Sequence, residues 1–421
     1  MSSGQAEAWP WDDAELRAGA EELRPDLDPR EVVARMIWNV VAEAGDGVAG
    51  ALVGALGAED ALHRAFPGGG GVSAAHGRAG DGPGVPSAPR PLRDGRARWA
   101  PRYDRRLVHR AMSAARRAGA GMLLPGDPHW PAGLADLGDH APLVLWVRGT
   151  AEVLAETAVA IVGARAATAY GEHVAGELSA ELADGGLVVV SGGAYGVDGT
   201  AHRAALRAGG RTVAVLAGGV DRVYPAGHAH LFDRIVRDGA VVSEVPCGTI
   251  PTKWRFLARN RVIGATAAAT VVVEAGWRSG SLNTAGHAAA LGRPLGAVPG
   301  PVTSATSAGC HRLLREYDAQ CITSAADVRE LLGLGLGHGP DSAHHTPEGA
   351  DAACAKDGDR DALRLSDALS KRVARNSIDL AQRSGLAPAR VEALLGVLEL
   401  EGAARRGPEG WRSSTAAEGR G

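Results

Sequence analysis

The sequence is poor in cysteine, and its few cysteines are poorly placed for cross-linking or metal binding. None forms a CxxC pair and none lies at zinc-ligand spacing from a histidine; the four are Cys247, Cys310, Cys321 and Cys354. Disulfide frameworks and structural zinc sites need such clusters, so the sequence predicts neither, and no metal site is expected. This pattern is typical of a reducing compartment.

Long apolar runs are missing as well. No stretch approaches the roughly 18 apolar residues that a membrane-spanning helix requires. Residues 1–11 lack both the basic start and the apolar centre of a secretory signal. We therefore expect a cytoplasmic protein with no membrane partner.

The chain carries little net charge of either sign, and lysine is rare. Its 45 Lys and Arg residues and 48 Asp and Glu residues give a formal net charge of −3. Global charge therefore predicts no nucleic-acid partner, and any basic surface must be local. The lysines are Lys253, Lys356 and Lys371, and all other cations are arginines. This bias indicates a GC-rich genome more than a function.

Glycine and proline, with 59 and 23 residues, are unevenly distributed and divide the chain. Stretches rich in Gly, Pro or Ser cannot bury enough apolar surface to fold, so they predict linkers. Apolar residues at helical spacing predict helices before and after the first linker. The predicted segments are a helical N-terminal region (12–66), a disordered linker (67–97), an α/β domain with an N-terminal extension (98–335, core 157–335), a second linker (336–360) and a winged-helix-like module (361–413).

Short, nearly continuous apolar runs alternate with helical patterns in the central domain. The runs fall at 158–162, 187–191, 212–216, 240–243, 270–273, 295–298 and 320–323. Strands buried on both faces have this character. Their alternation with helices predicts an α/β fold with a Rossmann-like, doubly wound, mostly parallel sheet. Such sheets bind ligands at the carboxyl ends of their strands, so the loops that follow are the candidate site.

Glycine-rich loops follow the first two predicted strands. Their glycines let an anion approach backbone amides, and an arginine in the first loop can donate two hydrogen bonds to a phosphate. The candidate residues are Gly163, Arg165, Ser191, Gly192, Gly193 and Gly196. Neither loop has the GxGxxG spacing of dinucleotide sites, so no cofactor is predicted. On these residues alone, an ordinary turn with a solvated arginine is an equal alternative.

A run of cations and aromatic rings follows the fourth predicted strand. Its candidate binding residues are Lys253, Phe256, Arg259, Asn260 and Arg261. Residues 253–315 carry eight cations and one acid, in contrast to the whole chain. This interleaving suits a single-stranded nucleic acid, because cations follow phosphates and rings stack on bases. The alternative is a solvated basic helix face with its phenylalanine in the core.

The fifth predicted strand leads into another possible anion site. Ser279, Gly280 and Ser281 open a helix there, and helix N-termini attract anions. Glu274, at the strand end, can act as a base, accept from a sugar hydroxyl or pair with an arginine. The sequence has no GxSxG elbow, no Walker A loop and no clustered metal ligands, so we predict no catalytic residue.

Taken in order, these motifs resemble the DNA-processing protein A (DprA/Smf) family. They span about residues 99–332 and occur in the family's order. The motifs are Gly163-Ala-Arg165, Ser191-Gly-Gly-Ala-Tyr-Gly196-Val-Asp198, Asp221-Arg-Val-Tyr224-Pro225, Phe256-Leu-Ala-Arg259-Asn260-Arg261, Glu274-Ala, Arg278-Ser-Gly-Ser-Leu-Asn-Thr284-Ala285, Val298-Pro-Gly300 and Ser307-Ala-Gly309. The helical N-terminal region and the C-terminal winged helix also fit this family.

The resemblance implies a single-stranded DNA-binding protein that is not an enzyme. Members of the family protect single strands and help load RecA recombinase on them, notably in natural transformation, and they act as homodimers. Carried over to this chain, the phosphate contacts are Arg165, Lys253 and the run Arg259-Asn260-Arg261. Phe256 lies against a base, and Gly163, Gly192, Gly193 and Gly196 let the strand approach the backbone. A general role in recombination fits the resemblance equally well.

Four motifs depart from the family's pattern. Two are helix starts: Asn283 stands where the family has an isoleucine, and Gly309-Cys310-His311 stands where it has Gly-Thr/Ala-Asn. Tyr195 stands where the family has a phosphate-binding cation, and His228 stands where it has an asparagine. The alternative function is a nucleotide-processing enzyme of the Rossmann-like phosphoribohydrolase class, which uses a strand-end glutamate. This chain has Glu274 but lacks that class's Pro-Gly-Gly-x-Gly-Thr loop.

The would-be recognition helix of the C-terminal module is acidic. Residues 388–402 hold Arg390 against Glu392, Glu399 and Glu401. Attraction to phosphate normally dominates DNA affinity, so this helix is poorly suited to a DNA groove. The sequence favours contact with a protein here.

Overall fold

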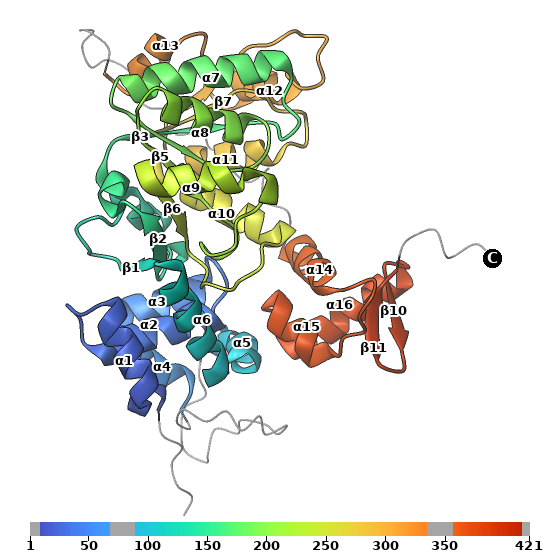
Figure 1. Cartoon of the computed structure of the whole chain (residues 1–421). Coiled ribbons are helices and arrows are strands. Elements are labelled where there is room, and N and C mark those ends of the chain that lie inside the picture. Colours follow the sequence, from blue (N-terminus) through green and yellow to red (C-terminus); the bar gives the residue numbers. More distant parts are fainter. Residues whose placement is uncertain (1–8, 68–88, 335–356, 415–421) are drawn as a thin grey trace, which may run out of the picture. The chain divides into compact units, whose positions relative to one another are not determined.

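The structure is a computed structural model and describes residues 9–67, 89–334 and 357–414. The chain divides into two compact units. One comprises residues 117–251 and 255–354, and the other comprises residues 1–116, 252–254 and 355–421. Figure 1 follows the elements of each unit along the chain.

The unit of residues 117–251 and 255–354 is built on a sheet whose described strands run in the order β1-β2-β6-β5-β4-β3-β7-β8-β9. The strands are β1 (Gly121–Leu123), β2 (Leu145–Gly149), β3 (Ala158–Val162), β4 (Val188–Ser191), β5 (Thr212–Val215), β6 (Ala240–Ser243), β7 (Ala269–Val272), β8 (Leu295–Ala297) and β9 (Gln320–Cys321). Neighbours from β6 through β9 pair in parallel, whereas β2 pairs antiparallel with both β1 and β6. The predicted doubly wound, mostly parallel sheet is confirmed.

Helices cover both faces of this sheet. They are α7 (Ala169–Asp184), α8 (Val197–Arg207), α9 (Ala229–Asp238), α10 (Lys253–Thr266), α11 (Gly280–Ala290), α12 (Ala308–Glu316) and α13 (Ala325–Leu331), with short 3-10 turns at Ala132–His140, Ala151–Ala155 and Ala226–His228. On one face, Ile161 packs in a core with Leu178 of α7. On the other, Val162 packs with Ile263 of α10 and Ala285 of α11. The order of the strands reverses between β3 and β7, since β4, β5 and β6 follow on one side of β3 and β7, β8 and β9 on the other. The carboxyl ends of strands beside such a switch point form a ligand crevice.

A buried histidine ties α8 to the sheet. The Oγ1 hydroxyl of Thr212 donates to the carbonyl of Val189 at 2.6 Å. The Nδ1 atom of His202 lies 2.7 Å from that same Oγ1. Because the hydroxyl proton is already used, the Nδ1–H of His202 donates to the Oγ1. Its Nε2 atom is buried without a hydrogen-bond partner. Burial, helped by nearby cationic groups, lowers the pKa of His202 from 6.5 to about 3, because protonation would place an unsolvated charge there.

This histidine makes the stability of the sheet depend on pH. The unfolded chain takes up a proton below pH 6.5 that the folded chain refuses until about pH 3, so stability falls as the pH drops through that window. At about 1.4 kcal/mol per pH unit, we expect this group to cost about 2 kcal/mol at pH 5 relative to pH 7. Urea unfolding of the wild type and His202→Asn at both pH values checks this. An equal pH dependence in the two proteins would show that His202 is not the cause.

The N-terminal part of the other unit is helical, as predicted. Its helices are α1 (Ala14–Leu23), α2 (Pro29–Val41), α3 (Gly47–Leu56), α4 (Ala58–Ala65), α5 (Arg90–Trp99) and α6 (Arg105–Ala118), with 3-10 turns at Pro10–Asp12 and Ala100–Arg102. Aspartates Asp13, Asp28 and Asp46 accept backbone hydrogen bonds at the starts of α1, α2 and α3.

Helix α5 begins inside the segment expected as a linker, 67–97. Trp99 is fully buried, its ring meets that of Trp38 edge to face at 5.0 Å, and its Nε1 donates to Asp46 at 2.9 Å. Burial of this ring anchors the helix despite the Gly/Pro-rich sequence before it. Residues 68–88 of the predicted linker lie outside the described residues.

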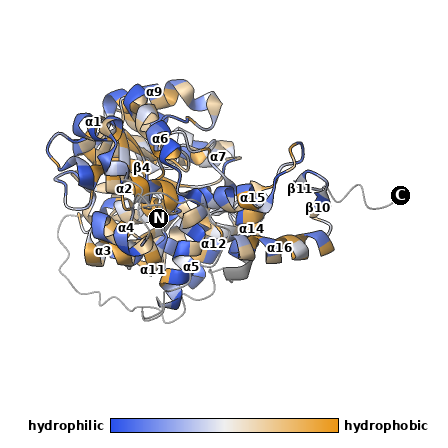
Figure 2. Ribbon diagram, turned by 90° about the horizontal axis from the view of Figure 1, so that it is seen from below, coloured by the Kyte–Doolittle hydropathy of each residue, from blue (hydrophilic) through white to orange (hydrophobic). Residues whose placement is uncertain are grey.

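The C-terminal part of that unit has the predicted winged-helix fold. It comprises α14 (Asp357–Ala368), α15 (Ser377–Ser384), α16 (Pro388–Leu400) and a hairpin of β10 (Ala404–Gly407) and β11 (Gly410–Ser413). The turn between α15 and α16 passes through Gly385 in the left-handed conformation, at a φ of 68°. In Figure 2 the ribbon of α16 changes between hydrophobic and hydrophilic colours. Its buried residues Val391, Leu394, Leu395 and Leu398 pack with residues of α14, α15 and β10 in the small core of this module. Of the second predicted linker, residues 335–356 lie outside the described residues.

Candidate nucleic-acid interface

The loop after β3 presents its arginine to solvent. The Arg165 side chain is exposed, and its Cζ lies 4.9 Å from the centroid of the Phe256 ring. No ion pair to Arg165 occurs among the described residues. Gly163, in the same loop, is needed for packing, since a Cβ there would lie 2.6 Å from a methyl group of Val197. The loop thus aims a guanidinium over an aromatic face.

A buried carboxylate of the protein itself binds the backbone of the glycine loop after β4. The Asp198 carboxylate accepts from the amides of Gly192 at 3.1 Å and Ala194 at 3.4 Å, so those two donors are already used. Burial raises the pKa of Asp198. Gly193 and Gly196 have φ values of 68° and 74°, a region that favours glycine.

Ser191, the last residue of β4, is fully buried. Its hydroxyl donates to the carbonyl of Ile161 at 2.7 Å, which links the ends of β4 and β3. The serine that sequence reasoning placed among the DNA-binding residues therefore lies inside the sheet and holds two strand ends together.

Arg259 of α10 lies beneath this edge of the sheet. It is 5% exposed, and its Nη1 donates to the carbonyl of Gly192 at 2.9 Å and to that of Val215. Gly192 makes room for it, because a Cβ there would lie 2.5 Å from the guanidinium. Burial lowers the pKa of Arg259 to about 10 while Asp198 opposes that shift, so it is charged at neutral pH. Its guanidinium supports the loops rather than extending into solvent.

Arg261 is also buried, and it faces another partner. Its Nη1 and Nη2 atoms donate to the two carboxylate oxygens of Glu244, both at 2.5 Å. Its Nε donates to the carbonyl of His140 at 3.0 Å. The side chains of the pair are 7% and 6% exposed. Sequence reasoning placed Arg261 at phosphate and missed Glu244, because no local pattern connects residues 17 positions apart.

Asn260 connects α10 to the start of α11. Its Nδ2 lies 3.2 Å from both the carbonyl of Gly280 and the Oδ1 of Asn283. Ser279 is the N-cap of α11, and its hydroxyl lies 2.7 Å from that of the buried Ser281. Gly280 is exposed, with no atom within 4 Å of the position its Cβ would take. The α11 start therefore lies open at the surface, with Asn260 fixing it from below.

One exposed cation and two rings cover the buried arginine; we call Arg165, Tyr224 and the half-buried Phe256 the cation–aromatic surface. The ring of Tyr224, 51% exposed, lies 5.6 Å from that of Phe256. The Cζ of Arg259 approaches the Phe256 centroid at 5.8 Å. Lys253 is exposed three residues before Phe256 on α10. Stacked rings beside cations can bind a base and its phosphate together.

Two of the departures from the family's pattern, Tyr195 and His228, contact each other. The Tyr195 ring meets the His228 ring edge to face at 4.8 Å, and Tyr195 is 52% exposed. The Nδ1 atom of His228 lies 3.1 Å from the carbonyl of Gly193. Tyr195 therefore adds a second exposed ring, in addition to that of Tyr224, on the loop after β4, where it packs against His228.

Glu274 is fully engaged at the start of α7. Its carboxylate accepts from the amide of Thr168 at 2.9 Å, from the Thr168 hydroxyl at 2.7 Å and from the Thr306 hydroxyl at 2.9 Å. The residue is 3% exposed. A Cβ at Gly171 would lie 2.2 Å from this carboxylate, so glycine is required there. These contacts are those of a carboxylate that caps a helix.

The described residues lack the marks of several other kinds of site. No described helix is long and apolar enough to cross a bilayer. No group of three or more His, Cys, Asp or Glu side chains gathers in these ranges as metal ligands do. Burial raises the pKa of the Cys247 and Cys310 thiols to about 12, so neither is an activated nucleophile.

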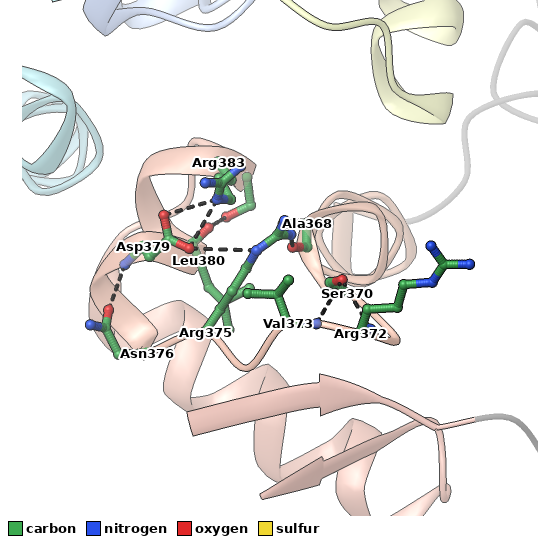
Figure 3. Close-up of polar contacts among 10 residues, drawn as sticks. Ala368, Ser370, Arg372, Val373, Arg375, Asn376, Asp379, Leu380 and Arg383 are labelled. Carbon is green, nitrogen blue, oxygen red and sulfur yellow. Dashed lines mark hydrogen bonds and ion pairs between the residues drawn. The ribbon is translucent and has the colours of Figure 1, made fainter. Parts of the chain in front are cut away.

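The winged helix keeps its charges paired around α15. Figure 3 shows Asn376 accepting from the Asp379 amide at 2.8 Å, while the Asp379 carboxylate accepts from Arg383 at 2.9 Å and pairs with Arg375 at 3.6 Å. Arg372 points away from these contacts (Figure 3). On α16, the cation Arg390 is paired with Asp361 at 2.9 Å. The helix that would enter a DNA groove thus offers no unpaired cation.

Comparison with known proteins identifies two regions. The model of DNA recombination-mediator protein A matches residues 121–333, and that of the DprA winged helix domain matches residues 349–410. The putative DNA processing protein DprA of Mycobacterium tuberculosis is 46% identical over 75% of this chain and 83% of its own length. Protein Smf of Escherichia coli is 36% identical over 55% of this chain and 63% of its own.

Solved structures of similar proteins exist. One concerns the single-stranded DNA binding mode of DNA processing protein A from Helicobacter pylori; it is 31% identical, covers 51% of this chain and 95% of that chain, and has a TM-score of 0.46. The family match rests on the sequence models and on the M. tuberculosis relative, which together span the sheet and the winged helix. This chain therefore belongs to the DprA/Smf family of DNA recombination-mediator proteins.

Proposed function

We propose that this protein binds single-stranded DNA at the cation–aromatic surface and assists recombination or DNA uptake. The observation that carries the proposal is the Arg165 guanidinium, 4.9 Å from the centroid of the Phe256 ring. A base stacked there places its phosphate within reach of the exposed cation. The site lies at the carboxyl edge of a doubly wound sheet, where such folds bind ligands.

The proposed path of the strand uses the exposed groups and is supported by the buried ones. Lys253 and Arg165 neutralise phosphates, and Tyr224 and Tyr195 offer further faces for bases. Arg259 beneath them contributes positive potential and fixes the loops, since it is held by backbone carbonyls. The open start of α11 at Gly280 is a further seat for a phosphate.

The partners in this proposal are single-stranded DNA, RecA recombinase and a second copy of the chain. The family's description as a recombination mediator supports a role beside a recombinase. In this proposal the chain acts as a homodimer and transfers a coated strand to RecA. If this is so, adding the protein to a single strand should shorten the lag before RecA filaments form, which can be followed by RecA ATP hydrolysis.

The proposed function requires neither catalysis nor a cofactor. The alternative, nucleotide hydrolysis, needs a strand-end glutamate that can reach its substrate. The Glu274 carboxylate instead accepts hydrogen bonds from Thr168 and Thr306 and is almost fully buried. This engagement favours a binding protein over a phosphoribohydrolase.

The experiment that tests the proposed function is fluorescence anisotropy with the full chain. Affinities for a single-stranded oligonucleotide and for a duplex of the same length are compared at 50 and 200 mM salt. We expect tighter binding to the single strand and a steep loss of affinity with salt, because bound cations release counterions from phosphates. Equal affinity for the two forms would contradict the proposal.

Replacing Glu274 separates the two functions. Glu274→Gln removes the charge that caps α7 and turns one acceptor into a donor that faces hydroxyl and amide donors. We expect the free energy of unfolding to fall by about 2 kcal/mol, the scale of hydrogen bonds to a charged group. Urea unfolding measures this, and the wild type should release no nucleobase from nucleoside monophosphates. Base release that Glu274→Gln abolishes would support the enzyme instead.

A further inference from the structure

A small open pocket lies between α11 and α12, apart from the cation–aromatic surface. Its volume is about 210 Å³, and its lining includes Trp277, Leu282, Asn283, Arg312, Leu313 and Tyr317. Pockets for drug-sized ligands start at roughly 300 Å³, so this one suits a single planar ring system. Both leucine side chains and aromatic rings line the pocket, so its walls are partly apolar.

The pocket holds a cation between two rings. The Arg312 Cζ lies 5.4 Å from the centroid of Trp277 and 5.6 Å from that of Tyr317. Its Nε donates to Glu316 at 2.7 Å, and this bond raises the pKa of Arg312. The guanidinium is therefore fixed and permanently charged.

Trp277 is the exposed wall of the pocket. Its side chain is 60% exposed, while the other tryptophans of the chain, all of which are described, are buried or half-buried. Leaving so large an apolar ring in water is costly, and exposed aromatic rings are enriched at binding sites. Its free face, beside a fixed guanidinium, has the chemistry of a base-stacking platform.

The start of α11 borders the pocket. Ser279, the N-cap of this 11-residue helix, lines the pocket together with the exposed Arg278. Asn283, on the first turn, is held by Asn260. Asn260 follows Arg259, which lies under Phe256. One continuous stretch of α10 therefore connects the pocket to the cation–aromatic surface.

We propose that this pocket takes one nucleobase of a bound single strand, stacked on Trp277, with its phosphate at the start of α11. This inference rests on the proposed function and extends the strand's path to a second stacking position. Phe256 holds one base, and Trp277 holds another farther along the same strand. The exposed Arg278 neutralises a phosphate between them, while Arg312, paired with Glu316, contacts the ring of Trp277.

Tryptophan fluorescence tests the pocket directly. The full-length protein is titrated with oligodeoxythymidines of increasing length while its emission is recorded, because a base stacked on an indole quenches it. We expect quenching by strands long enough to span both stacking positions. Trp277→Phe should keep the affinity within about 3-fold but lose most of the quenching. Trp130→Phe, a half-buried tryptophan of the same unit, is the matched control and should keep the quenching.

A second experiment measures the DNA affinity of the variant Trp277→Ala. On long oligonucleotides we expect roughly 5- to 100-fold weaker binding, the range that removal of a base-stacking ring gives. On strands too short to reach from Phe256 to the pocket, the change should be under about 2-fold. Because Trp277 is largely exposed, the variant is expected to fold, and its urea unfolding curve verifies this.

The outcomes separate the two proposals. If the wild type binds single strands and Trp277→Phe retains the quenching, the pocket does not hold a base, while the proposed function stands. If Trp277→Ala leaves DNA affinity unchanged and alters the sedimentation of the protein alone, the pocket is a contact between copies of the chain, and the base site is wrong. If no oligonucleotide binds, both proposals fall.

Discussion

Replacing both Arg165 and Phe256 with alanine is expected to weaken single-strand binding roughly 100-fold at low salt. One base loses its stacking partner, and one phosphate loses its cation. The two side chains contact each other, so the effects of the single variants need not add. Arg165 is exposed and Phe256 is half-buried, so a urea unfolding curve verifies that the variant is folded at the temperature of the binding experiment.

The salt dependence of this variant distinguishes the two losses. Removal of one phosphate contact should reduce the slope of log affinity against log salt by about 0.7, and removal of the ring should not change it. Adding Lys253→Ala should reduce the slope by a similar step. Arg237→Ala, which removes an exposed arginine in the last turn of α9, is the matched control. An equal loss with Arg237→Ala would mean that diffuse charge, not this surface, binds the strand.

The strands and their carboxyl-end loops were predictable because each depends on local sequence. Apolar runs buried on both faces mark β3 and β6 at the bounds predicted, Ala158–Val162 and Ala240–Ser243. Glycines in the loops after β3 and β4 predict that another group lies close to the backbone, and the structure has such a group at each of them. At Gly163, Gly192 and Gly193, however, what approaches is a side chain of the protein itself.

The exposure of the cations was not predictable from the pattern. Consecutive residues of a helix point about 100° apart, so the run Arg259-Asn260-Arg261 should place one of its members outside. All three are buried, because α10 is enclosed from Ala258 to Ala265. Their partners belong to other elements, among them Gly192, Glu244 and Gly280. Only the tertiary arrangement decides which arginines meet solvent.

Tertiary packing also decides which groups of the loop after β4 are free to bind a ligand. Asp198 is close in sequence to the amides of Gly192 and Ala194, but it lies in the first turn of α8 and accepts from the loop rather than capping the helix as expected. The sequence does not tell whether those amides face an anion or this carboxylate. The pairing of Tyr195 with His228 is likewise a contact between separate loops. Local chemistry therefore locates the binding edge, and packing selects the residues that reach it.

Arg261→Ala is expected to destabilise the protein more than any other substitution considered above. It leaves the Glu244 carboxylate buried without its bidentate partner, and removing one member of such a pair costs about 3 to 5 kcal/mol. Urea unfolding of the full chain measures the loss in the sheet-bearing unit. The double variant Arg261→Met with Glu244→Leu, which removes both charges, should recover most of it.

DNA binding by the same variant decides between two roles for Arg261. A guanidinium bonded to Glu244 and to the His140 carbonyl is not free to meet a phosphate, so the folded fraction of Arg261→Ala should bind single strands with an unchanged salt slope. Measuring anisotropy at a temperature well below the unfolding transition keeps that fraction high. If stability is retained while affinity and salt slope both fall, Arg261 contacts phosphate, as its place in the cationic run predicts, and the ion pair opens when DNA binds.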